Sequence, residues 1–518
     1  MNGWPILTTL TLTPLLGALM TWIIGRDSAR AARASAVAFS LLAFLQAAVL
    51  VMRFNTAATG LQFVERHAWI PALHVDYFVA VDGLSILLVI LSALLIPFAL
   101  ALSPVASNQP HGYYGLFLLL QTGLFGTFTA LDFFHWFLYW ELSLVPAYFL
   151  IKLWGGENRR AAATQFFVYT FVGSVTLLLA MQAVYLATGT FDLIRLADLA
   201  RSGELGRNLQ TKLQWTGLSS GALGGLLFAG AFLGFAVKIP VMPFHTWLPD
   251  TYATAPTGVT MILTGAMSKM GVYGLLRILI PIFPQPMRDS LGLLMPLAVL
   301  TIVASAFAAF VQKDLKRLLA YSSMNHLGYC LLGLFAVLEP SFNSAAGAGE
   351  RAAVLSGVLL QLFNHGITAA TLFGFIALFE KRSGGRRAIG DFGGLRQVAP
   401  VLAGLMGIAI FASVGLPGLN GFVGEFLIFK GAFPLAPVPT TIATLGLLMT
   451  AVFYLTMIQR VFAGPLNSAW TKFPDLSRGE MALFVPATVL MLVLGVAPGL
   501  LLSLVNPAVL EFVKRLTP

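Results

Sequence analysis

The sequence predicts an all-α polytopic membrane protein with about 14 transmembrane helices. Of its 518 residues, 58% are hydrophobic and only 10% are charged, whereas soluble domains carry about 25% charged residues. Apolar runs of about 20 residues recur from one end of the chain to the other, each long enough as a helix to cross the roughly 30 Å hydrocarbon core. No segment is left over for a soluble domain.

The expected spans follow from the apolar runs and the polar or Pro/Gly residues between them. They lie near residues 3–24, 32–53, 78–103, 113–131, 133–154, 162–187, 221–243, 257–281, 290–311, 315–337, 352–379, 398–430, 439–461 and 481–505. The N-terminus has no basic region or small-residue cleavage site, so it is expected to be a retained first helix. Four regions result: three N-terminal helices (1–112), a first half (113–281), a second, inverted half (282–461), and a loop with the last helix (462–518).

Two spans are expected to be broken helices. The seventh contains Lys238 followed by Pro240 and Pro243, and the twelfth is too long for one crossing and contains Pro417 among four glycines in SVGLPGLNGFVGEF (413–426). Proline has no N–H, so the carbonyls of residues 236, 239 and 413 are predicted to lose their helical partners. Freed backbone of this kind is tolerated at membrane depth only beside protein or a wet cavity. The alternative is that these prolines are kinks that serve packing alone.

The two broken spans lie five apart, so they have opposite orientations in the membrane. Transporters often pair such helices in inverted repeats, here spans 4–8 with spans 9–13. More Lys and Arg lie in the connections after odd-numbered spans than on the opposite side. The positive-inside rule then places both termini on the non-cytoplasmic side. The longer connection at 191–212 is amphipathic and is expected to lie at the membrane surface.

Charge and cysteine content exclude several classes of function. The net charge of +10 comes from Lys and Arg that lie singly or in short groups, without the basic stripe of a nucleic-acid binder. The single cysteine, Cys330, excludes an iron–sulfur cluster or a cysteine-rich zinc site held by this chain alone. The sequence has no phosphate loop, no dinucleotide motif and no metal-ligand spacing among its seven histidines. We therefore expect no bound cofactor or metal and no independent catalytic site.

Six ionisable residues are expected inside the membrane, at a cost of roughly 2.5–3.5 kcal/mol for each charge near the bilayer centre on insertion scales. They are Glu141, Lys238, Lys269, His326, His365 and Glu425. A series of bases, acids and imidazoles is what proton transfer through a low-dielectric interior requires. In particular, movement of a carboxylate such as Glu141 would let Lys238 release its proton. The structural alternative is a Lys–Glu contact that fixes helix register, with the histidines as satisfied core residues.

Several long strings in the chain are familiar. They are AVDGLS (80–85), LYWELSLVPAYFLI (138–151), FAVKIPVMPFHTWLPD (235–250), DLKRLLAYSSMNHLGY (314–329), DFGGL (391–395) and GLPGLNGFVGEFLIFKG (415–431). This pattern resembles the antiporter-like membrane subunits of proton-pumping NADH:quinone oxidoreductase, respiratory complex I, and most closely their subunit M, or chain 4, branch. The resemblance extends from about residue 75 to about residue 505. Subunits of membrane-bound hydrogenases, photosynthetic NDH complexes and multisubunit cation/proton antiporters carry many of the same strings.

The resemblance implies fourteen helices, an inverted five-helix repeat and a midplane chain of protonatable residues. Glu141 is similar to the family's fifth-helix glutamate, Lys238 to the lysine of its broken seventh helix and Lys269 to the central lysine of its eighth. His326 and His365 resemble its connecting histidines, and Glu425 resembles its terminal acid.

The resemblance also implies the setting of the chain. It implies that NADH, FMN, iron–sulfur clusters and quinone are bound by partner subunits, whose redox energy moves the protons. The implied partners are other membrane-arm subunits, homologous antiporter-like subunits among them, together with lipids, in a bacterial inner membrane. The chain departs from the family pattern at Tyr252 and Thr254, where a His and a Glu are usual, and at Gln165, where a lysine is common.

Two other functions stay open beside proton translocation in such a complex. A subunit of a cation/proton antiporter would share the fold, but a sodium path would require clustered carboxylates and hydroxyls, and only Glu141 and Glu425 are deep acids. A scaffold bundle that anchors partners would not depend on the ionisable residues at all.

Overall fold

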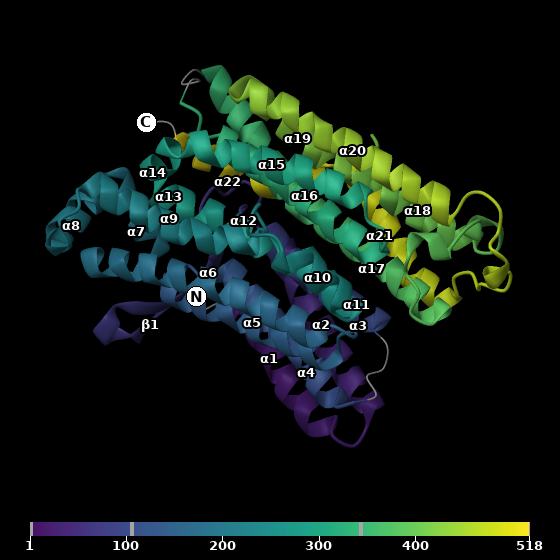
Figure 1. Ribbon diagram of the computed structural model, residues 1–518. Helices are drawn as coiled ribbons and strands as arrows, with labels where there is room; N and C mark the ends of the chain where they lie inside the picture. The colour runs from purple at the N-terminus through teal and green to yellow at the C-terminus, as the bar shows by residue number, and fades with distance from the viewer. Residues whose placement is uncertain (1–3, 104–107, 341–344, 517–518) are drawn as a thin grey trace.

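The computed structural model describes residues 4–103, 108–340 and 345–516, and most of these residues are helical (Figure 1). Nine helices of this described part are long and apolar enough to cross a membrane, and the shorter helices at 86–102 and 400–414 are also apolar. The polytopic helical fold is confirmed. The number of fourteen spans, their orientation and the division into four regions stay predictions, and residue 3, where the first expected span begins, lies outside the described residues.

The N-terminal region contains a β-hairpin that the sequence reading did not include. Helices α1 (Ile6–Ile24) and α2 (Ala29–Arg53) are followed by the antiparallel strands β1 (Gln62–Ile70) and β2 (Val75–Val81), and α3 (Ile86–Leu102) comes next. The expected span at 78–103 is therefore wrong in its first residues. The apolar run of β2, VDYFVAV, is rich in valine and aromatic residues, which favour strands. Helix α3 begins after the turn that follows β2, in which Asp82 accepts a hydrogen bond from the N–H of Leu84.

The first half follows the expected spans closely. It contains α4 (Pro110–Thr129), α5 (Phe133–Trp154), α6 (Arg159–Thr188) and α9 (Ser220–Lys238). The amphipathic connection after α6 forms two short helices, α7 (Leu193–Arg201) and α8 (Glu204–Lys212). Asp132 begins α5 by accepting hydrogen bonds from the N–H groups of Phe134 and His135, which satisfies two of the free donors at this helix end.

The seventh span is broken, as its prolines predict. Helix α9 ends at Lys238, and the chain continues through Pro240 and Pro243 into α10 (Trp247–Thr254). One detail of the prediction is wrong: the carbonyl of Ala236 is not free, because it accepts a hydrogen bond of 2.9 Å from the N–H of Val241.

The eighth span contains two π-helical turns. It runs through α11 (Thr257–Ile262), η3 (Leu263–Met267), α12 (Lys269–Gly274), η4 (Leu275–Leu279) and α13 (Ile280–Ile282), where η3 and η4 are π-helical. Its apolar core is buried throughout. Such turns free a carbonyl from the regular helical ladder and occur often at functional sites.

The second half surrounds a long helix, α17 (Ala345–Ser383). The other helices are α14 (Pro284–Asp289), α15 (Leu291–Phe310), α16 (Leu315–Ala336), α18 (Pro400–Val414), α19 (Asn420–Leu435) and α20 (Pro437–Val461). The twelfth expected span is indeed two helices, α18 and α19, separated by a turn at 415–419 that contains Pro417. Gly415 has a φ of 82° there, a left-handed conformation that favours glycine.

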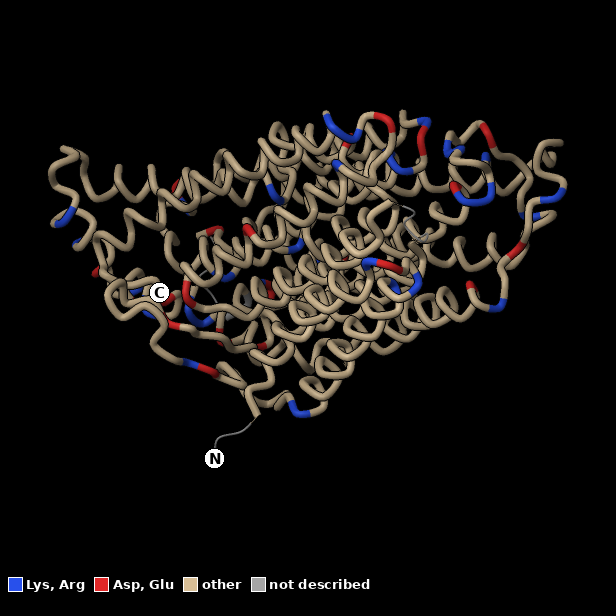
Figure 2. The backbone as a smooth tube through the Cα atoms, turned by 90° about the horizontal axis from the view of Figure 1, so that it is seen from below, with Lys and Arg blue, Asp and Glu red and all other residues tan. Residues whose placement is uncertain are grey.

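The C-terminal region holds α21 (Arg478–Val496) and α22 (Gly499–Leu516). The expected last span at 481–505 is thus divided, because α21 ends before Pro498 and a second helix follows. Helix α22 packs against α17 and α3, which places the C-terminal helix beside the third helix of the N-terminal region. Figure 2 shows that most Lys, Arg, Asp and Glu lie toward the periphery, with only a few in the helical middle.

Candidate functional site

Four of the six predicted ionisable residues form one continuous series inside the bundle. The Nζ atom of Lys269 lies 2.8 Å from Nδ1 of His365. The ring of His365 lies 5.0 Å, centre to centre, from the ring of His326, and Nδ1 of His326 lies 3.0 Å from Oε1 of Glu425. All four side chains are buried. We call these four residues the polar row; they come from α12, α17, α16 and α19.

The packing of α19 on α17 places Glu425 in the row. Gly424 allows this approach, because a Cβ atom there would lie only 2.9 Å from the backbone nitrogen of Gln361 on α17. The Nε2 atom of Gln361 donates a hydrogen bond of 3.2 Å to Glu425 Oε1 and lies 3.4 Å from His326 Nδ1. Gln361 is a residue that the sequence reading missed. Its signal was present, since it lies four residues before His365 and therefore on the same helix face.

The π-helical turn η3 orients Lys269. Its ammonium donates to the carbonyl of Thr264 at 2.5 Å and to the hydroxyl of Ser268 at 3.3 Å, and it faces His365 Nδ1. These three acceptors match the three protons of an ammonium group. When the lysine is charged, Nδ1 of His365 accepts the hydrogen bond and its ring proton lies on Nε2.

The other two predicted residues, Glu141 and Lys238, lie apart from the polar row. Lys238 is buried, and its Nζ atom lies 4.8 Å from the centre of the Trp140 ring. No ion pair joins Lys238 to a carboxylate among the described residues, although Glu141 is the charge that attracts it. Glu141 contacts Ser174, whose hydroxyl also accepts a hydrogen bond of 2.9 Å from Trp140 Nε1. The structure thus forms two groups where the sequence suggested one series.

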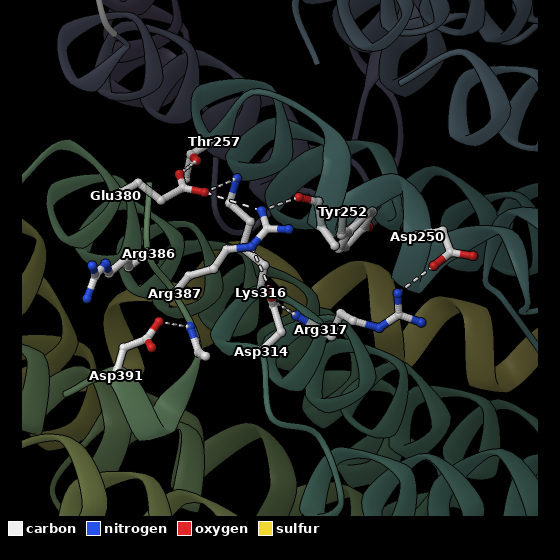
Figure 3. Close-up of polar contacts among 12 residues, drawn as sticks. Asp250, Tyr252, Thr257, Asp314, Lys316, Arg317, Glu380, Arg386, Arg387 and Asp391 are labelled. Carbon is white, nitrogen blue, oxygen red and sulfur yellow. Dashed lines mark hydrogen bonds and ion pairs between the residues drawn. The ribbon is translucent and has the colours of Figure 1, made fainter. Parts of the chain in front are cut away.

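A cluster of charges holds the loop between α10 and α11 (Figure 3). Lys316 Nζ lies 2.9 Å from Glu380 Oε1, and Arg387 Nε lies 2.6 Å from Asp314 Oδ2. Arg387 also lies 3.3 Å from Glu380. We call Asp314, Lys316, Glu380 and Arg387 the loop cluster.

The loop cluster also binds backbone groups at the end of α10 and in the loop that follows it. Lys316 donates to the carbonyl of Ala255 at 3.2 Å, and Arg387 donates to the carbonyl of Ala253 at 2.5 Å. Glu380 accepts a hydrogen bond from Thr257 as well. The segment that carries Tyr252 and Thr254 is therefore fixed by charges from α16, α17 and the residues after it. Sequence reasoning treated these basic residues only as topology signals, and nothing in their spacing distinguishes the buried Lys316 from its neighbours.

The described residues contain no group of three or more His, Cys, Asp or Glu side chains placed to hold a metal ion. What the polar row offers chemically is a set of groups that each accept and release a proton, in contact with one another and shielded from solvent.

Comparison with known proteins assigns the fold to a family. Residues 130–453 match the family described as NADH:quinone oxidoreductase/Mrp antiporter, TM. The chain is 36% identical over 522 residues to NADH-quinone oxidoreductase subunit M of Rhodobacter capsulatus, covering 98% of this chain and 96% of the relative. It is 32% identical over 545 residues to the subunit of the same name in Mycobacterium tuberculosis, covering 98% and 94%.

Solved structures have the same fold. A chain in respiratory complex I from Thermus thermophilus with bound NADH matches with a TM-score of 0.84 and 29% identity, covering 98% of this chain and 99% of that one. A chain of the Mrp complex from Dietzia sp. matches with a TM-score of 0.81 and 21% identity over the whole of both chains, which shows a shared fold.

Proposed function

Because this chain belongs to the NADH:quinone oxidoreductase/Mrp antiporter membrane family, we propose that its polar row carries protons as part of the membrane arm of NADH:quinone oxidoreductase. The chain is a proton-translocating subunit whose transport is coupled to quinone reduction elsewhere in the complex. The observation that carries this proposal is the succession of four buried ionisable groups in the bundle interior. Lys269 and His365 lie at hydrogen-bond distance, as do His326 and Glu425, and the two imidazole rings between them are 5.0 Å apart.

The contacts in the polar row support one order of proton transfers. Lys269 gives a proton to Nδ1 of His365. The ring of His326, 5.0 Å away centre to centre, then receives the other ring proton of His365 on its own Nε2, which has no hydrogen-bond partner among the described residues. His326 then gives the proton on Nδ1 to Oε1 of Glu425, across 3.0 Å. After the transfer each histidine carries its remaining proton on the opposite ring nitrogen, so both rings return to their starting tautomer before the next proton moves along the row.

Glu141 and Lys238 act at the other end of this path. Their separation beyond ion-pair distance leaves Lys238 stabilised by the Trp140 ring and by the more distant charge of Glu141. A movement of Glu141, driven by a neighbouring subunit, changes how firmly Lys238 holds its proton. Electron transfer takes place in partner subunits, which bind NADH, FMN, iron–sulfur clusters and quinone, and this chain contributes no catalytic site of its own.

The outer surface fits lateral neighbours. Large apolar side chains of α6 and α20 are exposed, among them Leu179, Leu186, Val438 and Leu448. Such faces suit lipid or other membrane-arm subunits, including homologous antiporter-like ones, in a bacterial inner membrane. We place both termini on the non-cytoplasmic side, from the distribution of Lys and Arg.

The antiporter alternative is less well supported. A sodium ion prefers several oxygen ligands, whereas the polar row offers a single carboxylate that already pairs with a histidine. The likeness to the Mrp chain concerns the fold alone.

The test is NADH-driven proton pumping in membranes that contain the complex with Glu425→Gln, with assembly measured in parallel. Glu350→Gln is the matched control, because Glu350 lies on α17 where it meets α19, the helix of Glu425, but forms a more exposed pair with Lys430 of α19. We expect Glu425→Gln to abolish pumping in an assembled complex and Glu350→Gln to leave it unchanged. Equal pumping in both variants would refute the proposal.

A further inference from the structure

The polar row and the Lys238 group are separated, and proton transport through both requires a connection. Lys238 lies at the end of α9, whereas Lys269 begins α12, beyond the π-helical turn η3. Between them stands α10, the short helix that follows the break in the seventh span. A proton path between Lys238 and Lys269 therefore depends on the side chains of α10 that lie near both lysines.

Tyr252 on α10 reaches toward Lys269. Its side chain is almost completely buried, and its hydroxyl lies beside the side chains of Thr264 and Ser268 and interacts with both. Ser268 Oγ in turn lies 3.3 Å from Lys269 Nζ. The Tyr252 hydroxyl is thus one hydroxyl group away from the first member of the polar row.

On the other side, Tyr252 and Lys238 line the same small cavity. Its volume is about 10 Å³, and Ser268 also lines it, together with apolar side chains that include Phe166 and Trp247. A cavity of roughly 10–15 Å³ holds one water molecule when two or more polar groups are within reach. An ammonium and two hydroxyls meet that condition, since the ammonium donates and the hydroxyls both donate and accept.

We propose that Tyr252 and Ser268, with one water molecule in this cavity, form the proton bridge between Lys238 and Lys269. The bridge rests on the function proposed above and extends it by two residues. Lys238 gives a proton to the water, and the water passes one of its own protons to the Tyr252 oxygen. Tyr252 then passes its hydroxyl proton to Ser268, and the Ser268 proton goes to Lys269. One lysine becomes a neutral amine and the other an ammonium, while the water and both hydroxyls end unchanged.

This role explains why a phenol works at position 252. Phenol, serine hydroxyl and water each accept one hydrogen bond while donating another. A group must do both to pass a proton along a chain of hydrogen bonds. Phenylalanine would fill the same space and keep the packing against Phe373, but it lacks the hydroxyl group and would interrupt the chain of hydrogen bonds there.

The test uses Tyr252→Phe and Ser268→Ala in the assembled complex, with NADH-driven proton pumping as the readout. Tyr113→Phe is the matched control, because Tyr113 is also a buried phenol that donates to a serine, Ser103, but lies outside the path. We expect Tyr252→Phe and Ser268→Ala to lose as much pumping as Lys238→Ala, and Tyr113→Phe to lose none. If Tyr252→Phe reduces assembly, Ser268→Ala decides the question, since it removes only one small hydroxyl.

Two further variants separate a bridge from a packing role and from failure of the proposed function. Tyr252→His is expected to keep pumping, because an imidazole also accepts and donates a proton, whereas Tyr252→Leu is expected to lose it. Normal pumping in Tyr252→Phe together with loss in Lys238→Ala would overturn the bridge alone. Normal pumping in Lys238→Ala and Lys269→Ala would overturn the proposed function, and the bridge with it.

Discussion

Replacement of Glu380 by glutamine is expected to destabilise the loop between α10 and α11 far more than loss of a neighbouring ion pair. Glu380 is 23% exposed and pairs at 2.9 Å with Lys316, whose side chain is only 3% exposed. Removing one partner of a buried pair costs about 3–5 kcal/mol, since the other charge stays buried without compensation. Glu380 is partly hydrated and Lys316 keeps its bond to the Ala255 carbonyl, so we expect a loss of about 2–3 kcal/mol in the free energy of unfolding.

Arg317, which follows Lys316 on helix α16, provides the control. Arg317 pairs with Asp250 at 2.6 Å, a shorter distance, but the two side chains are 39% and 47% exposed. Exposed pairs contribute about 0–1 kcal/mol, so Arg317→Gln is expected to change stability by no more than that. The assay is denaturation by SDS of the detergent-purified protein for both variants. An effect of Arg317→Gln equal to or larger than that of Glu380→Gln would refute the reasoning from burial.

Three other outcomes follow from the structure. Gly424→Ala brings a Cβ to 2.9 Å from the backbone of Gln361, so it is expected to push α19 from α17 and reduce NADH-driven pumping at unchanged quinone binding by the partner subunits. Asp82→Asn breaks a buried pair with Arg277 of 2.5 Å and is expected to cost about 3–5 kcal/mol, measured by thermal denaturation against wild type. Burial raises the pKa of Asp132 to about 6, above the value of about 4 for an unfolded chain, so the folded state binds this proton more tightly. The stability that protonated Asp132 contributes at acidic pH is thus lost as the pH rises through 6. Asp132→Asn is expected to remove this pH dependence, which is measured as the difference in free energy of unfolding between pH 4 and pH 7.

Much of the fold could be predicted because the decisive signals are local. Pro240 and Pro417 break their helices through the backbone itself, whatever surrounds them, and both breaks are where the sequence places them. The hairpin strand β2 was missed because a short apolar run fits a strand and a buried helix equally well. Helix α22 was missed because its first residues continue the apolar pattern of α21.

The candidate site could be predicted in its members but not in its connections. A charge within an apolar span is visible in one sequence, and this identified Lys238 and Lys269. Which groups meet depends on how distant helices pack: Lys269 faces His365, 96 residues away, while Lys238 and Glu141 stay beyond ion-pair distance. The expectation that all six residues form one series was therefore only partly met, and Gln361 joined the row without being predicted.

Lys316 shows the same limit outside the row. Lys316 and Arg317 are adjacent basic residues and serve equally well as topology signals. The side chain of Lys316 is nevertheless buried against Glu380, whereas that of Arg317 is exposed. Only the contacts of α16 with α10 and α17 separate them. Burial of a given charge is a property of tertiary packing, which spacing along the chain does not encode.

Proton transport by the polar row can be tested with Lys269→Ala in the complete complex, with Lys430→Ala as the control for loss of an exposed lysine on α19. NADH-driven proton pumping is measured in membrane vesicles, and assembly is measured on the same membranes. We predict that Lys269→Ala assembles and does not pump, whereas Lys430→Ala pumps as the unmodified complex does. Undiminished pumping by an assembled Lys269→Ala complex would contradict the role of the row.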